Sequence, residues 1–139
     1  MVYALRRAGS YLRRGGKLIS IRPHRTWRPS VAIMEGRHRL PVATLLNPIF
    51  EVNLEAADAA LQRVVEDGSF TLAGIRSARF RTYLDRPSQM RTYLELINPP
   101  RPRFPPGARA RLDKMWDSAS PGARIEVTES LVVNALRRW

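Results

Sequence analysis

The chain has 139 residues, a formal net charge of +12 and 44% hydrophobic residues, which is the composition of a globular domain rather than a disordered segment. It has no cysteine, which excludes a disulfide scaffold, a thiolate-bound zinc ion and a thiol nucleophile. Its apolar runs are far shorter than the roughly 18 residues that span a membrane, and the N-terminus lacks the apolar core of a signal peptide, so we expect a cytoplasmic protein.

The positive charge is the first feature with a functional implication, because a strongly basic chain suggests nucleic-acid binding. All cations except Lys17 and Lys114 are arginines, however, a bias that a GC-rich genome also produces. The charge is also uneven, since residues 41–67 hold five acids against Arg63 alone, as expected of a fragment whose acidic complement lies elsewhere. Nucleic-acid binding is therefore an alternative that the composition does not favour.

The first segment predicts a helix, a turn and a strand. The apolar residues that recur at helical spacing are Val2, Leu5, Ala8 and Leu12. Gly15 and Gly16 are expected to end this helix, one of them with positive φ, because glycine tolerates the left-handed conformation. Residues 18–21 then form a short β-rich run that Pro23 stops.

The middle of the chain predicts a hairpin and a helix. Residues 31–34 and 40–46 are apolar runs on either side of residues 35–38, typical of a hairpin or a lid-like excursion. Asn53 is expected to cap the helix that follows, and Gly68 to end it. The apolar face of that helix consists of Leu54, Ala57, Leu61, Val64 and Val65.

Two strands with helices between them are predicted for the second half. Residues 70–84 form a strand whose two faces alternate, with Phe80, Thr82 and Leu84 on one side and Arg79, Arg81 and Tyr83 on the other. Ser88 caps a short helix that residues 98–100 stop, and a second helix spans residues 107–118.

Residues 120–122 predict a turn, and residues 124–138 a long final strand. The apolar residues expected to share one face of that strand are Ile125, Val127, Leu131 and Val133. Leu136 and Trp139 add apolar character to the other face at its end.

The segment LRRGGKLISIRP, residues 12–23, resembles a stretch late in class I S-adenosylmethionine (SAM)-dependent methyltransferases. In that family a Leu-Arg-Pro-Gly-Gly-x-Leu sequence ends a helix and leads into the fifth strand of a seven-stranded sheet. The matching residues are Leu12, Arg13, Gly15, Gly16 and Leu18. Arg14 departs from the pattern, because the family usually has proline there.

The order of the later elements extends the resemblance. Residues 54–67, 70–84 and 124–138 take the places of the family's next helix, its sixth strand and its antiparallel seventh strand. Residues 85–96 resemble an insertion that some small-molecule methyltransferases carry between those strands. The resemblance implies an α/β fold: a partial, Rossmann-like methyltransferase sheet with helices, ending in an antiparallel strand pair. It covers residues 1–139 as a single C-terminal half domain.

The family's cofactor site has no counterpart in the sequence. The family binds SAM through a D/E-x-G-x-G-x-G turn after its first strand. The chain has no such pattern, and Gly15-Gly16 precedes a strand instead of following one. The resemblance thus implies a half without a catalytic residue or cofactor of its own, which binds substrate or serves assembly. The alternatives are half of a split methyltransferase, with SAM bound through a partner half, and a basic nucleic-acid-binding domain.

His24, Arg25 and Trp27 are the candidate substrate-binding residues. They follow the strand at residues 18–21, and ligands of open α/β sheets bind beyond the carboxyl ends of the strands. A cation beside an aromatic ring suits an anionic or planar substrate, although a solvated loop is the alternative. No acid at metal-ligand spacing accompanies His24 or His38, so we expect no metal site.

A half sheet has surfaces that must be covered. The strand at residues 18–21 lacks the family's fourth strand as a neighbour, and the helix stripe Val2, Leu5 and Leu12 lacks part of its sheet. Unpaired edges and exposed apolar stripes favour association. We therefore expect a homodimer or a complex with a separate N-terminal half, and no association with a membrane.

Overall fold

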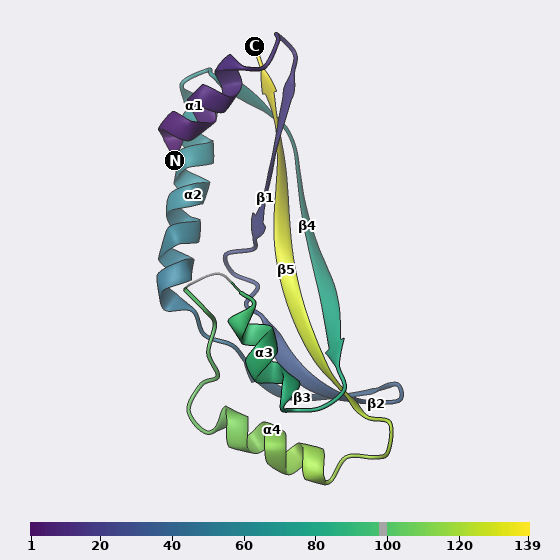
Figure 1. Ribbon diagram of the computed structural model, residues 1–139. Helices are drawn as coiled ribbons and strands as arrows, with labels where there is room; N and C mark the ends of the chain where they lie inside the picture. The colour runs from purple at the N-terminus through teal and green to yellow at the C-terminus, as the bar shows by residue number, and fades with distance from the viewer. Residues whose placement is uncertain (98–99) are drawn as a thin grey trace. The chain divides into compact units, whose positions relative to one another are not determined.

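The computed structural model describes residues 1–97 and 100–139 and has a mixed α/β fold (Figure 1). In these residues the elements are α1 (Val2–Ser10), β1 (Lys17–Pro23), β2 (Ser30–Glu35), β3 (His38–Thr44), α2 (Pro48–Glu66), β4 (Phe70–Leu84), α3 (Gln89–Glu95), α4 (Ala108–Asp117) and β5 (Arg124–Arg138). The strands form one antiparallel sheet in which β5 pairs with β1, β2 and β4, and β2 pairs with β3. None of the helices in the described part of the chain is long and apolar enough to cross a membrane.

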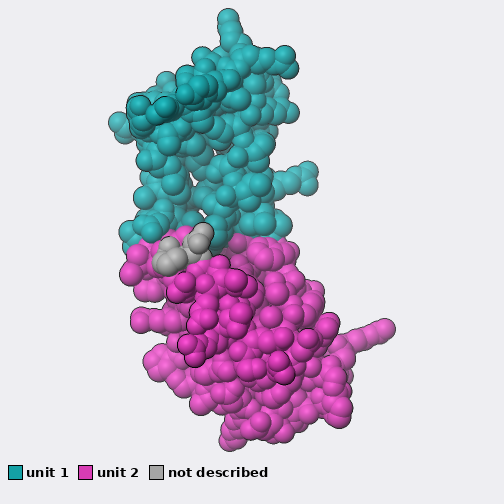
Figure 2. All heavy atoms as spheres, viewed as in Figure 1, with its two compact units in different colours: residues 1–25, 51–78, 131–139 teal, residues 26–50, 79–130 magenta. Residues whose placement is uncertain are grey.

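The chain divides into two compact units (Figure 2). The first unit contains residues 1–25, 51–78 and 131–139, and the second contains residues 26–50 and 79–130. The long strands β4 and β5 contribute residues to both units, and each unit has a hydrophobic core of its own.

The core of the first unit lies between two helices and the sheet. It consists of Leu61, Val64, Phe70 and Leu136. Val2, Leu5 and Leu12, the apolar stripe of the first helix segment, pack against it. The expectation that this stripe would lack cover within the chain is therefore wrong: α2, β4 and the end of β5 supply it.

The turn before β1 differs from the expected helix cap. Helix α1 ends at Ser10, ahead of both glycines, so neither of them ends it. Gly15 has φ of 76°, and the Gly16 N–H donates to the Arg13 carbonyl at 2.8 Å. Gly15 is thus the third residue of a four-residue turn, where a type II turn requires positive φ. The Gly15 N–H also donates to the Arg138 carbonyl at 2.9 Å, which joins the turn to the end of β5.

The start of α2 is a second correction. The helix begins at Pro48, and Asn53, the expected cap, lies in its interior. Proline suits the first turn because its missing N–H has no partner within the helix there. The expected apolar face is confirmed for Leu54, Ala57, Leu61 and Val64, which are buried. Val65, its fifth residue, is partly buried and packs against the core.

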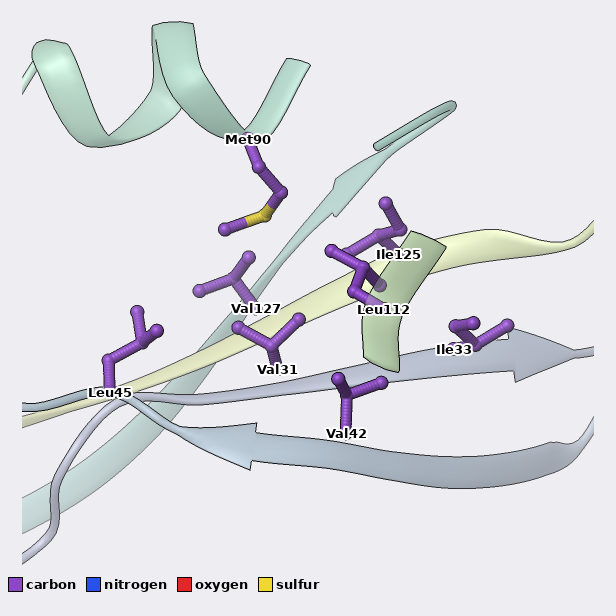
Figure 3. Close-up of a cluster of buried hydrophobic side chains, with 8 residues drawn as sticks. All are labelled: Val31, Ile33, Val42, Leu45, Met90, Leu112, Ile125 and Val127. Carbon is purple, nitrogen blue, oxygen red and sulfur yellow. The ribbon is translucent and has the colours of Figure 1, made fainter. Parts of the chain in front are cut away.

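The second unit has a two-layer arrangement. Residues Ser30 to Glu35 pair with Thr44 to His38, so the predicted excursion is a hairpin of β2 and β3. Figure 3 shows Met90 of α3 and Leu112 of α4 against apolar side chains of the sheet. The buried cluster consists of Val31, Ile33, Val42, Leu45, Met90, Leu112, Ile125 and Val127.

The connections of the second unit follow the predicted pattern in part. Ser88 precedes α3, but its side chain makes no capping hydrogen bond, and the helix ends at Glu95. Asn98 and Pro99, which were expected to stop this helix, lie outside the described residues. The turn at residues 120–122 is confirmed by a hydrogen bond from the Ala123 N–H to the Ser120 carbonyl at 3.0 Å.

We predict that Gly15→Val lowers the free energy of unfolding by about 1–2 kcal/mol, because a β-branched residue is strained at positive φ. A Cβ atom at Gly15 would meet nothing within 4 Å, so the loss would come from the backbone conformation alone. Urea denaturation measures it. Gly15→Asn is the control and should cost less, because asparagine tolerates this region. Equal stability of Gly15→Val and the wild type would contradict the assignment of the turn.

Candidate functional site

A buried carboxylate lies on the sheet of the second unit, on the face away from its core. Ile125 and Val127 point into the core, so Glu126 between them points to the opposite face. Its neighbour across the ladder is Ala32, whose small side chain leaves room above the sheet. Glu126 is only 1% exposed. An acid this deeply buried requires partners, because ionised carboxylates are costly to remove from water.

Two arginines from other strands pair with Glu126. The Arg39 Nε of β3 donates to Glu126 Oε1 at 2.7 Å, and its Nη2 donates to the Ser30 hydroxyl at 3.2 Å. The Arg81 Nε of β4 lies 3.6 Å from Glu126 Oε2. The side chains of Arg39 and Arg81 remain 38% and 62% exposed, so each guanidinium faces solvent as well as the acid.

Two hydroxyl groups complete the surroundings of Glu126. The Thr128 Oγ1 donates to Oε1 at 3.1 Å, and the Tyr83 hydroxyl donates to Oε2 at 3.3 Å. Both Glu126 carboxylate oxygens therefore have partners. The ring of Tyr83 stays exposed beside this cluster.

The pKa of Glu126 reflects a balance between burial and these partners. Burial alone would raise the pKa, because it disfavours the charged form. The hydrogen bonds from Arg39 and Thr128 and the positive charges of Arg39 and Arg81 outweigh burial, so the pKa lies below its usual value. Glu126 is therefore ionised at neutral pH and holds the arginines in place instead of acting as an acid.

A cation–aromatic pair adjoins this cluster. The Arg79 guanidinium lies over the Trp27 ring, 4.6 Å from its centroid. Arg79, Arg81 and Tyr83 alternate along β4 and therefore share a face. Ser130 donates a hydrogen bond to the Trp27 carbonyl and so fixes the segment before β2 against β5.

The structure places the predicted substrate-binding residues in different surroundings. Arg25 belongs to the first unit, where its guanidinium lies 3.9 Å from Glu55 and 3.5 Å from Asp58 of α2. His24 is half-buried in the same unit. Trp27 belongs to the second unit, and the cation on its ring is Arg79.

A second polar cluster holds α2 on the sheet of the first unit. The Arg22 side chain, 14% exposed, donates to Asp58 Oδ1 through Nε at 3.0 Å and to Asn134 Oδ1 through Nη1 at 2.6 Å. Arg25 shares Asp58 with it. Arg22 and Arg25 are thus both paired with carboxylates of α2, which indicates a structural role for these two arginines.

A pocket of about 450 Å³ in the second unit holds polar groups that are already paired. Arg124 lies 3.1 Å from Asp85, and the Ser120 N–H donates to Glu35 at 2.6 Å. Among residues 1–97 and 100–139, the histidine and acidic side chains form no group of three that would suit a metal ion. The Glu126 cluster with Trp27 and Arg79 is therefore the best-organised polar site that we identify.

Comparisons with protein-family models, with curated proteins and with solved structures gave no match.

We predict that Glu126→Gln lowers the free energy of unfolding at pH 7 by about 1–3 kcal/mol, because it removes charge-assisted hydrogen bonds in a buried position. The folded-state pKa lies below the unfolded value of about 4.3, so the stabilisation is present above that pH and disappears as the pH falls through the folded-state pKa. Urea denaturation from pH 7 to pH 3 should show the two proteins converging.

The matched control is Glu95→Gln, which removes an exposed carboxylate paired with Arg91. It should change stability by less than about 0.5 kcal/mol. A stability difference for Glu126→Gln that stays constant with pH would rule out an ionised Glu126 as its cause.

Proposed function

We propose that this chain is the C-terminal half of a class I SAM-dependent methyltransferase-like domain and is not catalytic alone. It would supply the substrate-binding or assembly half, with SAM bound by strands outside these 139 residues. This proposal makes the sheet of the first unit a partial, Rossmann-like methyltransferase sheet.

The arrangement of β1, α2, β4 and β5 is the observation that carries the proposal. β1 pairs antiparallel with β5 over Lys17–Pro23. Thr71 near the start of β4 bonds to Arg137 near the end of β5, and Tyr83 near the end of β4 bonds to Glu126 near the start of β5. β4 is therefore antiparallel to β5 and parallel to β1, and the chain passes from β1 to β4 through the hairpin of β2 and β3 and then through α2 (Figure 1).

The chain order agrees with the end of the methyltransferase sheet. β1, α2, β4 and β5 occur in the order of the family's fifth strand, next helix, sixth strand and antiparallel seventh strand, with β2 and β3 between β1 and α2 and with α3 and α4 between β4 and β5. The Gly15 turn precedes β1, as the Gly-Gly sequence precedes the fifth strand of the family. The hairpin of β2 and β3 and the helices α3 and α4 would then be insertions around this framework.

The uncovered side of β1 supports the idea of a half domain. Within the described residues, β1 has β5 as its one neighbour, so its other edge is open to a fourth strand. Ile19 and Ile21 are 53% and 67% exposed, whereas Leu18 on the opposite face packs against the core. Two exposed isoleucines on a short strand are the surface that helices of a missing half would cover.

We expect the isolated chain to bind no SAM in calorimetry, because the glycine-rich turn and the ribose-binding acid of the family have no counterpart in the sequence. Adding the polypeptide of a neighbouring reading frame that carries D/E-x-G-x-G-x-G should create a SAM site in the complex. A methyl-transfer assay on that complex then separates a split enzyme from a non-catalytic assembly. Micromolar SAM affinity of the isolated chain would contradict the proposal.

Without such a partner we expect a homodimer near 32 kDa, twice the 15.9 kDa chain mass, in light scattering at about 0.15 M salt. Ile21→Lys should produce a monomer, because it places a charge on the exposed face of β1. Tyr3→Lys is the control, since Tyr3 is 74% exposed on α1 and should leave the dimer intact. A monomeric wild type at tens of micromolar would show that β1 needs no cover.

A further inference from the structure

The sheet of the second unit has one covered face and one open face. Helices α3 and α4 bring Met90 and Leu112 onto the covered face. The open face carries polar side chains of β3, β4 and β5 and the segment before β2, which contact one another across the strands. We call it the arginine face and define it by Arg39, Arg79, Arg81, Trp27 and Tyr83.

The arginine face has an excess of positive charge that its own acid does not balance. Arg39 and Arg81 pair with the Glu126 carboxylate, whereas the Arg79 guanidinium lies over the Trp27 ring. Three guanidinium groups against one carboxylate leave two positive charges in excess. Glu126 is buried beneath them, whereas the Arg81 side chain is 62% exposed. The face therefore presents guanidinium N–H groups to solvent, and these groups suit phosphate oxygens.

Two aromatic rings lie among these cations. Trp27 is 37% exposed and Tyr83 is 45% exposed. Exposed rings beside arginines on an open sheet are the arrangement on which unpaired bases stack while their phosphates meet the cations.

The spacing along β4 favours an extended ligand over a compact one. Arg79, Arg81 and Tyr83 occupy every second position of the strand, so their side chains repeat at about 6.8 Å. Arg39 adds a cation from β3, which is separated from β4 by β2 and β5 in the sheet. A row of cations and rings across several strands is suited to a flexible polyanion with planar groups, not to a single small anion.

We propose that the arginine face binds single-stranded nucleic acid, with the arginines on phosphates and with Trp27 and Tyr83 against bases. The proposal is independent of the methyltransferase-like assignment, because it requires neither SAM nor a second half. Ser30, Thr128 and Glu126 act as positioning groups that hold Arg39 and Arg81 on the surface.

The test measures fluorescence anisotropy of labelled oligouridylate and oligothymidylate of about 12 nucleotides with the full chain over a range of salt concentrations. The logarithm of the affinity should fall with the logarithm of salt, with a slope of about −2 for contacts from three arginines. Arg81→Gln should reduce the magnitude of that slope by about 0.7. RNA and DNA strands that bind alike indicate recognition of phosphate and base, and tighter RNA binding adds a contact to the 2′-hydroxyl.

A matched charge control separates this site from general attraction to a basic protein. Arg91 on α3 is 85% exposed and pairs with Glu95, so Arg91→Gln changes the net charge as Arg81→Gln does. It should leave affinity and salt slope near those of the wild type. Equal losses in the two variants would overturn the proposal, provided that circular dichroism shows both to be folded.

A second pair of variants tests the rings. Tyr83→Phe and Tyr83→Leu both lose the hydrogen bond to Glu126, but only Tyr83→Leu loses the ring. Tyr83→Leu should weaken binding at least about fivefold relative to Tyr83→Phe, because stacking contributes to each bound base. Equal affinity of these two variants, equal binding of a duplex of the same sequence, or equal binding of polyglutamate of matched charge would overturn the proposal.

Discussion

The 15 residues of β5 form backbone hydrogen bonds with three other strands, and these ladders fix where every side chain of β5 points. Residues 131–137 pair with β1, and residues 124–128 pair with β2. Leu136 thereby enters the core of the first unit, and Ile125 and Val127 enter the core of the second. A slip of one residue in either ladder would turn apolar side chains outward and charged ones inward. The register of β5 is therefore the constraint on which both cores depend.

The same constraint produces the Glu126 cluster. Because Ile125 and Val127 must be buried, Glu126 has to occupy the other face, directly across from Ala32. An ionised acid at that place is stable only with cations nearby, and Arg39 and Arg81 come from strands on either side of it. The core and the polar face are thus two results of one strand register. The arginines would be much freer to move if Glu126 were absent.

Much of the secondary structure follows from local sequence patterns. The bounds of β4 and β5 agree with the predicted residues 70–84 and 124–138, because long alternating segments between turns have few competing interpretations. The predicted start of α2, at Asn53, was wrong because the first turns of the helix break the apolar periodicity. Ile49 and Val52 in these turns are 66% and 65% exposed. α1 likewise ends earlier than predicted, at Ser10, and Leu12 of its predicted apolar stripe packs against the core from the turn that follows.

The site could be predicted only in part. The alternation of Arg79, Arg81 and Tyr83 on one face of a strand is visible in the sequence. The pairing of these residues with Glu126 is not visible in the sequence. Glu126 lies 43 positions from Tyr83 and 87 from Arg39, and no local pattern specifies which strands become neighbours. Trp27 illustrates the same difficulty. A cation close to it in the sequence, Arg25, was expected beside its ring, whereas the fold places the Arg79 guanidinium there.

The position of β4 at the side of the sheet has a consequence for its backbone. Within the described residues β5 is its one neighbour, and residues 72–81 are exposed on both faces of the strand. In an antiparallel pair, alternate residues direct their N–H groups toward the neighbour, and the others direct theirs into solvent. We therefore expect amide protons along β4 to exchange with water at rates that alternate from one residue to the next. Arg76, Arg79 and Arg81 meanwhile place charge along the open edge, which disfavours the addition of another strand and keeps those outward amides in contact with water.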